Sequence, residues 1–175
     1  MVIKPQYVLL TLLYVSAYLI GQQCVKPTVN SAAGHGAGHY ETYSNDRFSY
    51  SVCYPPELLK AQGESPNGDG QEFLSKTNDA LMIVYGSNNV LGQTLQDALQ
   101  EEVEDFNAKS PKAKITYKAI KGGWFALSGV QGGKIVYQKT VLRKGVFKTF
   151  RLEYNESERA VYDPVVKVIF GCFRG

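Results

Sequence analysis

Histidine is scarce in this sequence of 175 residues: the two that occur, His35 and His39, lie in a glycine-rich stretch near the N-terminus. Histidine is the side chain whose unperturbed pKa lets it exchange protons near neutral pH. A nucleophile activated by histidine is therefore excluded from the rest of the chain. His35 and His39 could hold a metal if they lay on a helix, but the glycines between and around them disfavour one. We expect no metal and no other cofactor.

Cysteine is also rare, with three residues and no C-x-x-C spacing, so neither a zinc site nor a dithiol redox site is indicated. A disulfide between Cys53 and Cys172 is allowed if the protein is exported. Cys172 falls on the apolar stripe of a predicted helix, and Cys53 on the small-residue face of a predicted strand. The bond requires that helix to cover that face; two buried thiols are the alternative.

Long runs of one charge are missing as well. The chain has 19 Lys and Arg against 16 Asp and Glu, interleaved, with a net charge of +3. This distribution is typical of a mixed, solvated surface, and it does not indicate nucleic-acid binding. Hydrophobic residues at 44% and aromatic residues at 12% exclude a disordered chain.

The one long apolar run covers residues 7–20 and follows Lys4. Its fourteen residues match the core of a signal peptide and fall short of the ~20 that a membrane-spanning helix needs. We expect residues 1–23 to be a signal peptide, with an uncleaved N-terminal anchor as the alternative. The product would be periplasmic or secreted, touching a membrane only through this segment.

Cys24 follows the predicted leader and raises the question of lipidation. The preceding residues, Gly21-Gln22-Gln23, match a lipobox poorly, because a lipobox has a large apolar residue three positions before the cysteine. An unmodified thiol is the alternative. Residues 24–44 lack apolar periodicity and are rich in Gly, Ala and Ser, so we expect a flexible linker followed by one domain over residues 45–175.

The domain begins with strand patterns. Residues 48–54 alternate apolar and polar side chains and stop at Pro55-Pro56. Residues 71–76 and 80–85 follow, and the second run is apolar on both faces, which predicts a central strand. Short glycine-containing turns, among them Gly122-Gly123, separate four later runs and predict antiparallel hairpins rather than phosphate loops. These runs are residues 114–120, 124–128, 134–142 and 146–154.

Two helices complete the pattern. Thr94 is placed as an N-cap with Asp97 in capping-box register, and Leu95, Leu99, Val103 and Phe106 form an apolar stripe. Asp163-Pro164 is interpreted as N-cap and first residue of the last helix. The order β-β-β-α-β-β-β-β-α predicts an α+β fold, a single antiparallel sheet with two packed helices. The predicted core comprises Leu81, Ile83, Val84, Leu95, Leu99, Val103, Phe106, Val165 and Ile169.

Candidate chemistry is sparse. Asn67-Gly68-Asp69-Gly70 echoes the middle of a calcium loop, but Lys76 stands where that loop needs a carboxylate, so a tight turn is expected. Four carboxylates could pair for acid–base work, although nothing in their spacing requires it. Trp124 is expected in the core; if exposed, it is the first candidate for a partner anchor. The four carboxylates are Glu72, Asp79, Glu153 and Asp163.

Several segments follow one another along residues 45–173: Asn67-Gly68-Asp69-Gly70 with Phe73 and Ser75, Val84-Tyr85-Gly86, Trp124-Phe125-Ala126-Leu127-Ser128-Gly129, and Tyr162-Asp163-Pro164-Val165-Val166 with Phe173. This series resembles a group of small exported bacterial proteins whose element order is similar to the PsbP-like fold. The photosystem extrinsic subunit and periplasmic lipoproteins of the DcrB type share that fold. The resemblance implies assembly factors, adaptors and extrinsic subunits more than enzymes, and it supplies no catalytic motif.

These observations favour a non-catalytic binding or accessory protein of the cell envelope, with an unknown envelope protein or ligand as its partner. An immunity or inhibitor protein against a periplasmic toxin is one alternative, which a contiguous acidic or aromatic patch would favour. A hydrolase using carboxylates is the other, which a deep pocket lined by two or more carboxylates would favour.

Overall fold

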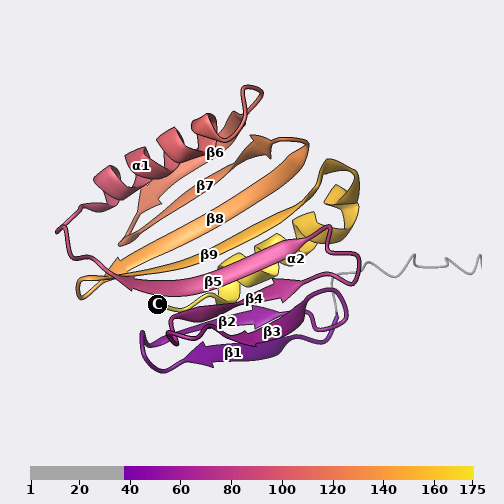
Figure 1. Cartoon of the computed structure of the whole chain (residues 1–175), viewed down its shortest axis with the longest axis horizontal. Helices are drawn as coiled ribbons and strands as arrows, with labels where there is room; N and C mark the ends of the chain where they lie inside the picture. Colours follow the sequence, from indigo (N-terminus) through magenta and orange to yellow (C-terminus); the bar gives the residue numbers. More distant parts are fainter. Residues whose placement is uncertain (1–37) are drawn as a thin grey trace, which may run out of the picture. The chain divides into compact units, whose positions relative to one another are not determined.

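The computed structural model describes residues 38–175 (Figure 1). Within them, a seven-stranded antiparallel sheet has the order β3-β4-β5-β9-β8-β7-β6. Two helices pack on it, so the predicted α+β class is confirmed. The strands are β3 (Lys60–Glu64), β4 (Gly70–Leu74), β5 (Leu81–Asn88), β6 (Lys114–Lys121), β7 (Trp124–Gln131), β8 (Lys134–Arg143) and β9 (Val146–Asn155).

A separate two-stranded sheet departs from the predicted single sheet. It pairs β1 (Glu41–Asn45) with β2 (Tyr50–Tyr54). Neither β1 nor β3 was predicted, because β1 has only Tyr43 and Asn45 turned inward and β3 is exposed along its whole length. Residues 41–44 of the predicted linker therefore belong to the folded domain. Residues 24–37 of that linker, Cys24 among them, and the predicted leader lie outside the described residues.

Helix α1 (Leu95–Ala108) begins as the sequence predicts. The hydroxyl of Thr94 accepts a hydrogen bond from the backbone N–H of Asp97 at 3.2 Å, and the Asp97 carboxylate accepts one from the N–H of Thr94 at 2.9 Å. This reciprocal pair is a capping box and satisfies two N–H groups that the helix leaves without partners.

Helix α2 (Arg159–Cys172) begins earlier than predicted. A 3-10 turn, η1 (Glu156–Glu158), leads from β9 into it, so Pro164 lies inside the helix and Asp163 does not cap it. The extra turn brings Tyr162 onto the buried face shared by Val165 and Ile169. Burial of that large ring repays the one intrahelical hydrogen bond that Pro164 cannot make.

The two helices cover opposite faces of the seven-stranded sheet (Figure 1). Ile135 and Val136 are neighbours on β8, and they belong to different hydrophobic clusters because successive strand residues point to opposite faces. Helix α1 lies over β6 and β7, while α2 lies over β8, β9 and β2. Helix α1 covers only part of its own face of the sheet. The same face of β4, β5 and β9 is left uncovered.

That placement explains how the predicted core fared. Leu81 and Ile83 of β5 lie on the same face of the sheet as α1. They are only half-buried because α1 does not extend over β5. Leu95 and Val103 flank the contact of α1 with the sheet and are also half-buried. The fully buried members of the predicted set are Val84, Leu99, Phe106, Val165 and Ile169.

The glycine turns are hairpins, as predicted. Gly122 and Gly123 join β6 to β7 with φ of 56° and 91°, and Gly132 and Gly133 join β7 to β8 with φ of 59° and 81°. These values lie in the left-handed region, which glycine enters without a Cβ penalty.

Candidate functional site

One concave site, named here the α2 pocket, opens between α2 and strands β7 and β8 and has a volume of about 390 Å³. Val166 and Phe170 line it from α2, and Tyr137 lines it from β8. Tyr117 of β6 stands at the rim with 53% of its surface exposed. The volume lies within the roughly 300–1,000 Å³ of ligand pockets, and an apolar lining with few polar groups is their usual character.

One polar group of the α2 pocket, the Asp163 carboxylate on α2, is held by a hydrogen bond. Asp163 accepts a hydrogen bond from the hydroxyl of Tyr154, and the ring of Tyr154 stacks on Tyr137 with 6.5 Å between centroids. Burial raises the pKa of Tyr154 well above its usual range, and the Asp163 carboxylate raises it further. Asp163, Ser128 and Lys167 are the polar side chains that line the pocket, whereas the side chain of Gln138 points to the α1 face, where it bonds Thr140. The site can therefore hold an apolar group and orient it through a few polar contacts.

Trp124 lies half-buried beside this pocket on the α2 face. Its ring meets that of Phe170 edge-on, with 5.3 Å between centroids. The buried ammonium of Lys139 lies 4.3 Å from the Phe170 centroid and donates a hydrogen bond to the Phe170 carbonyl at 3.0 Å. Burial lowers the pKa of Lys139, and the charge of Arg174 lowers it further. Trp124 thus supports one wall of the pocket, and its role as a partner anchor stays a prediction.

The predicted disulfide is present. Cys53 of β2 and Cys172 at the end of α2 are bonded, with Cα atoms 5.9 Å apart and a sequence separation of 119. Helix α2 packs against β2, and Cys53 is buried there, while Ser51 on the same face of the strand stays half-buried. The link fixes the C-terminal end of α2, and Phe170 two residues before it, relative to the smaller sheet.

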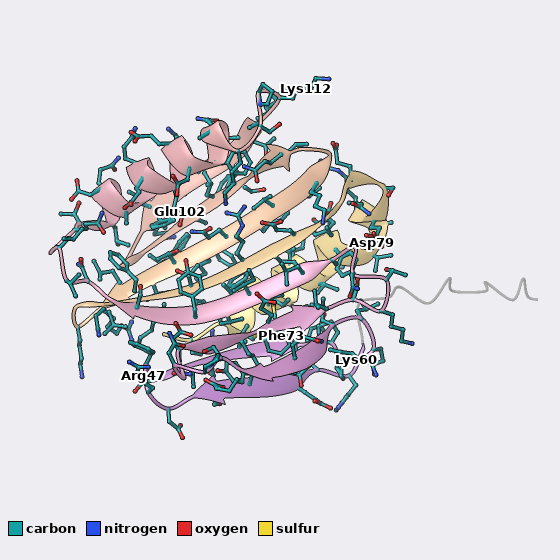
Figure 2. The ribbon with its side chains drawn as sticks, in the orientation of Figure 1. Arg47, Lys60, Phe73, Asp79, Glu102 and Lys112 are labelled. Atoms are coloured by element: carbon teal, nitrogen blue, oxygen red, sulfur yellow. A yellow bond between two sulfur atoms is a disulfide. The ribbon has the colours of Figure 1, made fainter. Side chains whose placement is uncertain are left out.

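The four candidate carboxylates are not gathered into one site. Glu72 and Glu153 lie on the α1 face of the sheet, in the part that the helix leaves uncovered. There Glu153 pairs with Arg151 at 2.6 Å. Asp79 lies in the β4–β5 turn, and Asp163 lies on the opposite face in the α2 pocket. Figure 2 shows Asp79 at the end of the sheet away from Arg47.

The segment that echoes a calcium loop is a hydrogen-bonded turn before β4. The Ser65 hydroxyl donates to Asp69 at 2.6 Å, and the Asn67 side chain donates to the other Asp69 oxygen at 2.7 Å. These bonds, led by Ser65, lower the pKa of Asp69. Gly70 is required where the chain passes β5, because a Cβ there would lie 1.8 Å from the carbonyl oxygen of Val84.

A smaller groove of about 190 Å³ runs between α1 and the uncovered part of the sheet. Three carboxylates of α1, Glu101, Glu102 and Asp105, line one wall, and Tyr85 lies opposite. Glu102 lies between the helix and the sheet (Figure 2). Burial raises the pKa of Tyr85, and the negative charge of Glu102 adds to the effect. Across residues 38–175 no three metal-ligating side chains come close enough to hold an ion.

Sequence reasoning did not find the α2 pocket, because its lining comes from β6, β7, β8, β9 and α2 and has no local motif. The smaller groove beside α1, called here the acidic groove, was predicted only in part. The sequence predicted the apolar stripe of α1, but it did not predict that Glu102 faces the sheet. Neither helix in the described part of the chain has the length and hydrophobicity to cross a membrane.

The strand order and helix placement give this chain an α+β fold of the PsbP-like type. The solution structure of cyanobacterial PsbP (CyanoP) from Synechocystis sp. PCC 6803 matches with a TM-score of 0.58 and 18% identity, covering 83% of this chain and 98% of that one. The predicted PsbP-like fold is thereby confirmed. A Pseudomonas aeruginosa protein of unknown function, PA94, matches with a TM-score of 0.45 and 12% identity over 74% of this chain and 92% of its own. No family model and no curated protein matches the sequence.

Proposed function

We propose that this protein is a non-catalytic binding or accessory protein of the cell envelope, periplasmic or secreted, and that the α2 pocket receives an apolar group of its ligand or partner. The observation that carries the proposal is the pocket itself. Its aromatic rim residue Tyr117 is exposed, while Phe150 beneath is fully buried. Binding of an apolar group at a concave apolar site of this size is favourable, because it removes apolar surface of the ligand from water.

Two further observations support the envelope location. The apolar run at residues 7–20 after Lys4 has the length of a signal-peptide core. The Cys53–Cys172 disulfide fits an oxidising compartment, where such bonds persist. N-terminal sequencing of the protein from cells tests the location: loss of the leader and recovery from the envelope are expected, and an intact Met1 in the cytosol contradicts it.

A binding role is favoured over hydrolysis by the inventory of the pocket. Two-carboxylate hydrolysis needs an acid and a second carboxylate about 5–10 Å apart. Asp163 is the one carboxylate lining the α2 pocket, and it already accepts a hydrogen bond from Tyr154.

A specific observation favours one second candidate, an immunity or inhibitor protein. The exposed side of α1 carries Asp97, Glu101, Glu104 and Asp105, and residues 95–108 contain neither Lys nor Arg. An acidic helix face is complementary to a basic toxin surface. In that case α1, rather than the α2 pocket, would make the contact.

The test fills each hollow separately. Ala126→Leu places a larger side chain in the α2 pocket, and Ala98→Leu places the same side chain in the smaller groove between α1 and the sheet. We expect an apolar fluorescent probe such as N-phenyl-1-naphthylamine to bind at least about tenfold more weakly to the first variant than to the second. Thermal melts establish that both variants fold. Equal probe binding by the two variants would contradict the proposal.

The same pair then identifies the partner. Each variant is used to capture material from envelope extract, followed by mass spectrometry. A protein or lipid retained by wild type and Ala98→Leu, but lost with Ala126→Leu, is the expected partner. A protein lost only when Glu101 and Glu104 are changed to Gln would favour the inhibitor reading.

A further inference from the structure

One end of the domain carries an open cleft of about 640 Å³, formed where the β1–β2 turn, the β8–β9 turn and the C-terminal residues meet. We name it the basic cleft. Figure 1 shows these turns and the C-terminus together at the left of the view, and Figure 2 places Arg47 there. The cationic residues that line it are Arg47, Arg143, Lys144, Lys148 and Arg174.

The cations of the basic cleft lack counter-ions. In the described part of the chain, none of the five lies within 4.0 Å of a carboxylate oxygen. Asp46 is the one acidic side chain in the lining, and the α-carboxylate of Gly175 adds a second negative charge, so positive charge is in clear excess. Unpaired cations in a concave surface focus a positive potential that attracts anions.

Lys148 shows that this excess reaches into the protein. Its side chain is buried, at 6% exposure, and its ammonium donates one hydrogen bond, to the carbonyl of Ser49 at 3.1 Å. Burial lowers its pKa, and the neighbouring charges of Arg143 and Lys144 lower it further. A partly desolvated ammonium with donors to spare is stabilised when an anion enters the cleft.

Two exposed aliphatic side chains stand next to these cations. Val90 and Leu91 are 85% and 80% exposed in the loop between β5 and α1. The N–H of Asn89 donates to the Gly145 carbonyl at 2.8 Å, which ties this loop to the β8–β9 turn that carries Arg143 and Lys144. The Asn89 side chain also bonds both the N–H and the carbonyl of Gln93 at 2.8 Å, so the loop has a fixed shape.

We propose that this end of the domain docks on an anionic phospholipid membrane. Val90 and Leu91 enter the boundary between headgroups and acyl chains, and the cations of the basic cleft contact lipid phosphates. Apolar side chains flanked by Lys and Arg are the combination that interfacial binding uses, since burial of apolar surface and attraction to anionic lipid act together. The α2 pocket takes no part, so this proposal stands or falls separately from the proposed function.

The electrostatic half is tested by vesicle co-sedimentation of the full chain. Arg143→Glu with Lys144→Glu is compared with Lys60→Glu with Lys112→Glu, exposed lysines away from the cleft that give the same change in net charge (Figure 2). On vesicles of about half phosphatidylglycerol, we expect the first pair to lower partitioning at least about tenfold and the second less than about twofold. The apolar run at residues 7–20 is common to all proteins compared and cancels. Equal losses, or no loss in either pair, would overturn the proposal.

The insertion half is tested by fluorescence. Leu91→Trp and the control Lys112→Trp each add one indole to the single native Trp124. Phosphatidylglycerol with brominated acyl chains should quench the added emission of the first variant and leave that of the control unchanged. Inorganic phosphate at millimolar concentration is the remaining arm: if it displaces the protein from the vesicles, the cleft selects free phosphate and lipid docking is wrong. Absence of quenching with Leu91→Trp overturns the proposal equally.

Discussion

The two helices pack on opposite faces of one sheet in unlike ways. Helix α2 closes a cluster of 17 buried residues, and the Cys53–Cys172 bond ties its last turn to β2. Helix α1 closes a cluster of five buried residues and has no covalent tie. The smaller sheet also covers part of the α2 face: its Tyr54 packs on Phe73 of β4 with 4.6 Å between ring centroids.

This difference separates a structural face from a more easily opened one. Regions with few buried apolar contacts open locally at a lower free energy than the centre of a core. We therefore expect α1 amides to exchange with solvent before those of β9 and α2. The α2 pocket sits on the rigid face, which suits a preformed site, whereas the acidic groove depends on the position of α1.

The largest expected effect comes from the α2 face. Leu152→Ala removes a fully buried side chain of β9 and should cost about 4–5 kcal/mol of unfolding free energy, at the upper end for this substitution because the surrounding cluster cannot collapse around the cavity. Urea unfolding measures it. A loss under about 2 kcal/mol would show that this face relaxes as readily as the other.

The disulfide comes next. Replacing both Cys53 and Cys172 by Ser should cost about 3–4 kcal/mol, because the bond closes a loop of 119 residues in the unfolded chain. Reductant should destabilise wild type by a similar amount and leave the double variant unchanged. If reductant affects neither protein, the two thiols are not bonded in solution.

The matched change on the α1 face should be milder. Leu99→Ala is expected to cost about 2–3 kcal/mol, because Leu99 lies in the smaller cluster at a helix that can shift toward the sheet. Hydrogen exchange should speed up over residues 95–108 and leave β9 unaffected. A loss equal to that of Leu152→Ala, with exchange rising everywhere, would remove the distinction between the faces.

The α1 region was also the part best predicted from sequence. Its N-cap, its capping box and its apolar stripe are short-range sequence signals within one helix. The capping motif placed Thr94 and Asp97, and the apolar periodicity placed Leu99 and Phe106. The start of α2 was misplaced, because Asp163-Pro164 imitates a helix start. The burial of Tyr162, a tertiary effect, moved the start to Arg159.

The sites divide along the same line. The disulfide could be anticipated as one of two outcomes, because each cysteine was assigned to a face of its element, but these assignments left two buried thiols as the alternative until the structure showed the bond. The α2 pocket and the basic cleft could not be, since each draws on distant segments: Arg47, Arg143 and Arg174 meet only after the sheet order is set. β3 was missed for a different reason, because an exposed edge strand needs no apolar alternation.

The smallest expected effect tests the local signal that fixes α1. Thr94→Ala removes the N-cap hydroxyl and should cost about 1 kcal/mol at neutral pH, against no measurable loss for Thr77→Ala, an exposed threonine in the β4–β5 turn. The hydrogen bond from the Thr94 N–H, and then that from its hydroxyl, hold the pKa of Asp97 below its usual 3.8. A depressed folded-state pKa stabilises the fold above pH 3.8 and loses that contribution as the pH falls through the lower value. The difference between wild type and Thr94→Ala should therefore shrink in acid without vanishing, because the Asp97 N–H still donates to the Thr94 hydroxyl. A difference that stays constant down to the acid transition would mean that the Asp97 carboxylate takes no part in the cap.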